Sequence, residues 1–203
     1  MIRDYALAAS GLLAAKIGGA SVKPYQPEGV WEAVAMPESN TKSYVRDTGE
    51  ALYRRSLYTF WKRAAPPASL EIFNAPNRET SCLRRERTDT PLQALNTLND
   101  PQFIEAARHL AEVALRTGRD DTGRILAEMA GRLLARPLRT EELTVIKKSL
   151  EQFTAYYTAH PDAAQQLIRS GDSKADPTLS PVQLAAATMV ANQLLNLDEV
   201  LNK

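Results

Sequence analysis

Apolar residues recur every three or four positions along most of the second half of the chain. The clearest stripe lies between residues 140 and 157, where Leu143, Ile146, Leu150, Phe153 and Tyr157 alternate at steps of three and four. This spacing predicts an amphipathic helix with one buried face. The same periodicity predicts helices over residues 2–16, 101–116, 121–136 and from 181 towards the C-terminus, with a short helix around residues 167–168.

Helix-start signals support these boundaries. Thr90-Pro91-Leu92-Gln93 has the pattern of a capping box, in which the Thr90 hydroxyl and the Gln93 amide satisfy each other's backbone N–H groups. Asp100 precedes Pro101 in the same way, Asp120 or Asp121 is positioned to cap the next helix, and Ser180 precedes Pro181. Several helices therefore have starts that the sequence defines locally.

Residues 53–73 have a different pattern. The run from Tyr53 to Arg63 is rich in aromatic residues and predicts a buried strand, and Leu70 to Phe73 predicts a second short strand after Pro66-Pro67. The fold class we expect is mainly α, with a minor β element, as short strands or a hairpin, around residues 53–73. We expect a single domain over residues 1–203, with a helix and ordered loop in 1–50, an aromatic and arginine-rich motif in 51–100, and a helical scaffold in 101–203.

The overall charge narrows the choice of partners. The 203 residues include 25 Lys and Arg against 24 Asp and Glu, a net charge of +1, so the whole molecule has no field that attracts nucleic acid or anionic lipid. The single cysteine, Cys82, excludes an intrachain disulfide and a cysteine-based metal cluster. No apolar run approaches the roughly 20 residues that span a bilayer, and we predict no membrane span.

Positive charge is nevertheless concentrated locally. Between Arg54 and Arg87 there are eight cations and three anions, and eight minus three leaves an excess of five. Guanidinium groups bind carboxylate, sulfate or phosphate in bidentate geometry. The candidate anion-binding residues are therefore Arg54, Arg55, Arg78, Arg84, Arg85 and Arg87. The alternative is that these arginines pair with Asp47, Glu50, Glu79, Glu86 and Asp89 and only fix loops.

Other chemistry has weaker support in the sequence. Tyr53, Tyr58, Phe60 and Trp61 alternate with basic residues, which is typical of a stacking platform for bases or sugars and equally of a core strand. Neither His109 nor His160 has a second metal ligand at a recognised spacing, so we predict no metal site. The chain contains no GxGxxG, GxxxxGK[ST] or CxxCH, so we expect no cofactor within it.

Four segments resemble a known family: IRDYALAASGLLAAKIGGASVKPYQPEGVWE, GEALYRRSLYTFWKRAAPPASLEIFNAPNRE, RRERTDTPLQALNTLNDPQFIEAARHLAE and ANQLLNLDEVL. Together they are similar to the C-terminal domain of planctomycete-type cytochrome proteins, known as domain of unknown function fifteen-fifty-three. The resemblance implies a large exported or periplasmic parent protein with upstream domains, often including a haem domain with CxxCH. It also implies that Met1 falls inside the family domain, so that this chain is its C-terminal portion. The family has no established catalytic residues to carry over.

These observations favour a structural or ligand-binding module of a larger exported, haem-containing protein, with the upstream domains and an anionic glycan as partners. The alternative is an enzyme module acting on an anionic polysaccharide, with the arginines holding the substrate and Glu50 or Glu79 as acid or base. Binding of single-stranded nucleic acid rests on the aromatic and basic run alone, and we predict no nucleic-acid partner.

Overall fold

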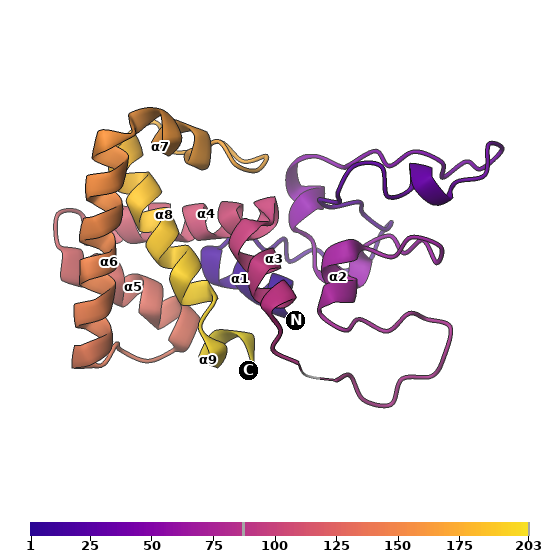
Figure 1. Ribbon diagram of the computed structural model, residues 1–203, viewed down its shortest axis with the longest axis horizontal. Coiled ribbons are helices and arrows are strands. Elements are labelled where there is room, and N and C mark those ends of the chain that lie inside the picture. Colours follow the sequence, from indigo (N-terminus) through magenta and orange to yellow (C-terminus); the bar gives the residue numbers. More distant parts are fainter. Residues whose placement is uncertain (87, 203) are drawn as a thin grey trace. The chain divides into compact units, whose positions relative to one another are not determined.

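The computed structural model describes residues 1–86 and 88–202, and helices dominate it (Figure 1). The chain forms two compact units. One comprises Met1–Leu12 with Thr97–Lys203 and is called the helical unit here; the other comprises Leu13–Asn96 and is called the loop-rich unit. The prediction of a mainly α fold is confirmed.

The helical unit is assembled around one central helix. Its helices are α1 (Ile2–Ser10), α4 (Pro101–Gly118), α5 (Thr122–Leu134), α6 (Thr140–Ala159), α7 (Pro161–Ile168), α8 (Pro181–Leu195) and α9 (Asp198–Leu201). Helix α8 packs against α4, α6 and α7, and its residues from Leu184 to Thr188 are all buried. A helix that is apolar on all sides must lie inside a bundle, and small residues such as Ala187 and Ala191 let neighbouring helices approach closely.

The predicted caps at Thr90, Asp100 and Asp121 are confirmed by their hydrogen bonds, whereas Ser180 precedes α8 without a side-chain cap bond. At the start of α3 (Pro91–Asn99), the Gln93 N–H donates to the Thr90 hydroxyl over 3.3 Å, and the Thr90 N–H donates to the Gln93 side-chain oxygen over 3.1 Å. The Asp100 carboxylate accepts from the N–H of Gln102 at the start of α4. Asp121 caps α5 in the same way.

The first helix is shorter than predicted. Helix α1 ends at Ser10 and does not continue to Lys16. Gly11 adopts a left-handed conformation, with φ of 84°, and its N–H bonds back to the carbonyl of Ala8. Glycine is the residue that most easily adopts this helix-ending conformation, so Gly11 ends the helix before the predicted end at residue 16.

The loop-rich unit contains only short elements. These are the 3₁₀ turns η1 (Glu32–Val34), η2 (Gly49–Tyr53) and η3 (Ser56–Tyr58), the short helix α2 (Ala68–Ile72) and the first part of α3. Among the described residues of this unit, the β character is limited to isolated bridges that join Ala14 to Arg54, Val22 to Thr59 and Lys62 to Ala65. The two strands predicted for Tyr53–Arg63 and Leu70–Phe73 are therefore wrong in detail: η2 and η3 interrupt or flank the first, and α2 occupies most of the second.

A buried cluster of charges fixes a loop onto α4 in the helical unit. The Arg108 side chain is fully buried and donates to Glu112 over 2.6 Å and to the carbonyl and hydroxyl oxygens of Ser173 over 2.7 and 2.6 Å. The Glu105 carboxylate accepts from the backbone N–H groups of Asp172 and Ser173 over 2.9 and 2.7 Å. Charges buried this deeply require such partners.

Gly171 permits this arrangement. Its φ is 92°, and a β-carbon added to it would lie 2.3 Å from the carboxyl carbon of Glu105. Any larger residue would push the loop away from the carboxylate that holds it. The loop after α7 is thus matched to the charges of α4 by a single glycine.

We predict that Arg108→Ala lowers the free energy of unfolding by about 3–5 kcal/mol, because it leaves the carboxylates of Glu105 and Glu112 buried without their guanidinium partner. Urea denaturation followed by circular dichroism measures the change. As a matched control, Arg124→Ala removes an exposed ion pair to Asp121 and should change stability by no more than about 0.5 kcal/mol. Equal, small losses for both variants would contradict a stabilising role for the cluster.

The stability of the fold should also depend on pH in the acidic range. Arg136 binds both oxygens of Glu142, and the Arg139 N–H also donates to this carboxylate; these bonds lower the pKa of Glu142 from 4.5 to about 2. A carboxyl group whose pKa is lower in the folded state stabilises the fold above its ordinary pKa, and that stabilisation is lost as the pH falls from 4.5 through 2.

The thermal midpoint of the wild type should therefore fall more steeply than that of Glu142→Gln between pH 5 and pH 2. Thermal melts over this range test the difference. The lowered pKa of Asp176, also about 2, contributes equally to both proteins and cancels in the comparison. Parallel curves for the two proteins would show that the Arg136–Glu142 contact adds no stability.

Candidate functional site

Arg54, the first of the predicted anion-binding arginines, is buried within the loop-rich unit. Its guanidinium donates to the carbonyl oxygens of Ala20 over 2.8 Å, Lys16 over 3.4 Å and Gly18. The same group stacks on the ring of Tyr58, 3.8 Å from the ring centroid. The Tyr58 hydroxyl in turn accepts from the Gly18 N–H over 2.8 Å. Arg54 therefore closes the loop over residues 16–20, and its two terminal NH₂ groups already have protein acceptors.

The aromatic residues of this unit form a small core. Trp31 is only 2% exposed and packs edge-on against Tyr44, with ring centroids 4.8 Å apart. Its ring also lies tilted against that of Phe60, with centroids 5.5 Å apart. The ammonium groups of Lys62 and Lys23 lie 4.8 and 5.5 Å from the Trp31 ring centroid. Cation–π contacts of this kind add stability to an aromatic cluster. Trp31, which lies in the ordered loop predicted within residues 1–50, is thus the centre of this core.

Arg78, another of the predicted arginines, also contacts an aromatic ring. Its guanidinium carbon lies 4.8 Å from the centroid of Trp61. The neighbouring Glu79 forms an ion pair of 3.0 Å with Arg63, and both of these side chains are exposed. Trp61 is therefore covered by a cation, and Glu79 is one of the acidic residues that does pair with arginine.

Arg84 and Arg85 are placed differently. Both lie in the loop over residues 77–90, where every described side chain is exposed, and neither forms an ion pair with another described residue. Arg55 is exposed as well. Arg87 lies outside the described residues. Of the described candidates, Arg54 is buried, Arg78 stacks on Trp61, and the others are exposed without a ring contact. The anion site stays a prediction, and it rests on these other exposed arginines.

The ends of this loop are anchored. The Asn74 side chain donates to the Thr88 hydroxyl over 2.7 Å, and the Gln93 side chain donates to the same oxygen over 2.8 Å. Gln93 also donates to the carbonyl of Ile72 over 2.9 Å. The loop that carries Arg84 and Arg85 is therefore held at its base by α2 and α3, which belong to the same unit up to Asn96.

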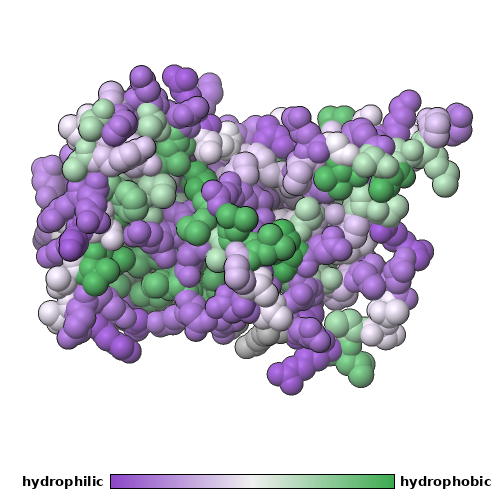
Figure 2. Space-filling model, viewed as in Figure 1, coloured by the Kyte–Doolittle hydropathy of each residue, from purple (hydrophilic) through white to green (hydrophobic). Residues whose placement is uncertain are grey.

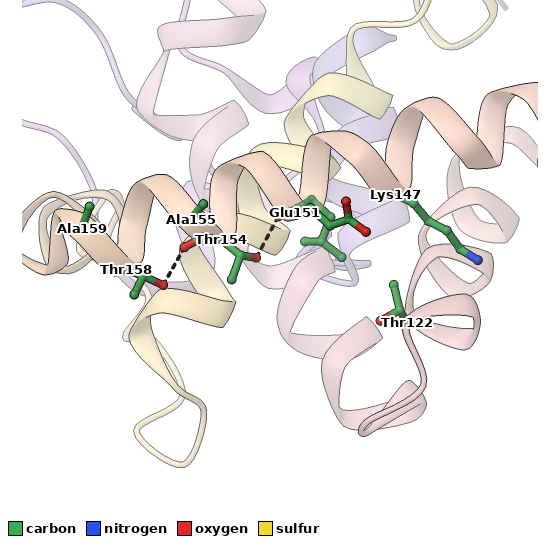
Figure 3. A pocket seen from close by; sticks show the side chains of 8 residues that line it. Thr122, Lys147, Glu151, Thr154, Ala155, Thr158 and Ala159 are labelled. Atoms are coloured by element: carbon green, nitrogen blue, oxygen red, sulfur yellow. Dashed lines mark hydrogen bonds between the residues drawn. The ribbon is translucent and has the colours of Figure 1, made fainter.

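A surface groove lies elsewhere, within the helical unit. It has a volume of about 880 Å³ and runs along α6 (Figure 3). The residues that line it are Thr122, Lys147, Leu150, Glu151, Thr154, Ala155, Thr158 and Ala159. None of the five candidate arginines that the structure describes lines this groove. The apolar stripe of residues 140–157 predicted this helix. The neighbouring stripe of threonine and alanine on the same helix, which lines the groove, was not predicted as a site.

The two histidines have structural contacts. His109 Nδ1 lies 2.6 Å from the carbonyl oxygen of Ser10, and His160 Nδ1 lies 2.8 Å from the carbonyl oxygen of Tyr156. Within residues 1–86 and 88–202, no group of three or more His, Cys, Asp or Glu side chains is arranged to hold a metal ion.

Apolar surface is also present on α3. Leu92, Leu95 and Leu98 are 57%, 58% and 40% exposed and follow one another at helical spacing. Figure 2 shows hydrophobic side chains gathered over this helix, between largely polar surroundings. No helix among the described residues is long and apolar enough to cross a membrane.

Comparison with known proteins gives one result. No curated protein and no solved structure matches the chain significantly. A family model does match, over residues 1–150, which is most of the chain and includes the loop-rich unit, α4 and α5. The chain belongs to the PSD1 family, described as proteins of unknown function (DUF1553).

Proposed function

We propose that this chain is a non-catalytic, ligand-binding module whose loop-rich unit presents the loop over residues 77–90 to an anionic polymer, such as a sulfated or carboxylated glycan. The observation that carries this proposal is the position of Arg84 and Arg85. They are exposed and form no ion pair with the described residues. Two adjacent guanidinium groups of this kind suit the fork geometry of sulfate and carboxylate.

The rest of the loop-rich unit acts as a support. Arg54 fastens the loop over residues 16–20, the lysines flank Trp31, and Arg78 covers Trp61. Binding residues are commonly carried on loops that a rigid scaffold positions. These cations form contacts within the unit, whereas Arg84 and Arg85 remain accessible to a ligand.

We further propose that the module works within a larger exported, haem-containing protein, with upstream domains as its immediate partners. This part rests on the resemblance of the four quoted segments and on family membership. Reading the coding sequence upstream of Met1 tests it. An open frame that encodes CxxCH behind a signal peptide supports the proposal, whereas an in-frame stop immediately before Met1 contradicts it.

The alternative of an enzyme module requires two carboxyl groups on either side of a scissile bond, roughly 5–9.5 Å apart for glycoside hydrolysis. Of the two candidates, Glu79 is paired with Arg63 over 3.0 Å, and Glu50 lies exposed in η2. The ion pair of Glu79 favours a role in fixing the loop. We therefore prefer binding over catalysis.

Titration calorimetry with a heparin oligosaccharide at low salt tests the binding site. We expect the wild type to bind and the double variant Arg84→Ala, Arg85→Ala to bind at least about tenfold more weakly, because two charge-assisted contacts are lost. Its thermal midpoint should stay unchanged. Arg169→Ala, which removes an exposed arginine of the helical unit, is the matched control and should bind like wild type. No binding by the wild type, or equal binding by the double variant, overturns the proposal.

The supporting role of Arg54 gives a separate prediction. Arg54→Lys keeps the positive charge but has no planar fork to reach the three carbonyl oxygens, so it should lower the free energy of unfolding of the loop-rich unit by about 2–3 kcal/mol. Hydrogen exchange of the amides at residues 14–22 reports this change locally. Unaltered exchange in the Arg54→Lys protein would show that the carbonyl contacts contribute little.

A further inference from the structure

The groove side of α6 carries a stripe of six polar residues with a symmetric order. They are Thr140, Thr144, Lys147, Glu151, Thr154 and Thr158, separated by steps of four, three, four, three and four. This spacing places all six on one face of a helix. All are exposed except Thr154, which is partly buried. The last four of the six line the groove described above.

The order of this stripe is self-complementary. Read in either direction it is Thr, Thr, charge, charge, Thr, Thr, and reversal exchanges lysine for glutamate. If two copies of α6 lie antiparallel and are centred near residue 149, Lys147 of each copy faces Glu151 of the other. The outer threonines then meet threonines. A surface that matches itself under a two-fold rotation is the requirement for an isologous dimer interface.

The hydroxyl groups of the stripe do not oppose burial. Thr144 donates to the carbonyl of Thr140 over 2.9 Å, Thr154 to that of Leu150 over 2.7 Å, and Thr158 to that of Thr154 over 2.7 Å. Figure 3 shows the last two of these bonds along the helix. A hydroxyl that is already hydrogen-bonded loses little when water is removed, and its methyl group remains for packing.

The charged pair at the centre is available for a partner. Neither Lys147 nor Glu151 forms an ion pair with any residue that the structure describes. Within one helix, lysine four residues before glutamate is the weaker order for an i,i+4 pair. Between antiparallel copies both charges find an opposite charge instead. The alanines Ala155 and Ala159 beside them line the groove and leave room for close helix approach.

We propose that α6 is a homodimerisation surface, in which the groove over residues 147–159 of one chain receives the N-terminal half of α6 of a second chain in antiparallel orientation. The net charge of +1 gives the copies no strong mutual repulsion. A helix of 20 residues is about 30 Å long, so the contact lies near the lower limit of specific interfaces. We expect a reversible dimer. This proposal is independent of the glycan-binding loop.

Sedimentation velocity of the full chain, from about 1 µM to about 500 µM, tests the proposal by charge exchange. The wild type should show a reversible monomer–dimer equilibrium. Lys147→Glu should weaken the dimer by about tenfold or more, because the symmetric interface gains two repulsive contacts, and Glu151→Lys should do the same. The double variant Lys147→Glu, Glu151→Lys should restore it. Both positions are exposed, so circular dichroism melts should be unchanged.

Crosslinking tests the orientation. In a Cys82→Ser background, a mixture of Thr144→Cys and Thr154→Cys chains should form the mixed disulfide faster than either variant alone, since residue 144 of one copy faces 154 of the other and equivalent positions lie about 15 Å apart along the axis. A chain that remains monomeric at all concentrations overturns the proposal. A dimer whose affinity is the same in the wild type and in the single variants at Lys147 and Glu151 also overturns it. So does faster formation of 144–144 crosslinks than of 144–154 crosslinks.

Discussion

The loop-rich unit depends on the burial of one guanidinium group. A buried arginine must find acceptors for its N–H donors, and Arg54 finds them in the carbonyl oxygens of a loop more than thirty residues earlier in the chain. The backbone of residues 16–20 lacks regular hydrogen bonding of its own, so the side chain replaces it. Arg108 plays the equivalent role in the helical unit, where it holds the loop after α7. Both units therefore use an arginine where a helix or sheet would otherwise supply backbone partners.

This use of arginine separates residues that look alike in sequence. Arg54 and Arg55 are neighbours, yet one is 5% exposed and the other lies on the surface. Local charge excess alone overstates the number of groups that a ligand can reach. The structure reduces the described candidate arginines to the exposed ones, and two of these, Arg84 and Arg85, lie on a loop that the Thr88 contacts anchor.

Features that depend on neighbours in sequence were predictable, and those that depend on distant contacts were not. The caps formed by Thr90 and Asp100 could be predicted because donor and acceptor are two or three residues apart. The aromatic run after Tyr53 suggested a strand because its residues favour strands, but its rings are used in cation–π contacts and its backbone turns through η3. Nothing near Arg54 or Arg108 in sequence identifies the carbonyl groups that they bind. Likewise, the groove on α6 needs Thr122 from another helix.

Helix α8 is the element against which α4, α6 and α7 all pack. The match to the family model ends at residue 150, halfway along α6, and so does not reach α8. A chain cut at that boundary would leave the buried faces of α4 and α5 in contact with water, an apolar surface that promotes aggregation. The stretch that matches the family model and the stretch that buries these apolar faces are therefore different, and a fragment intended for expression must extend to at least Leu195.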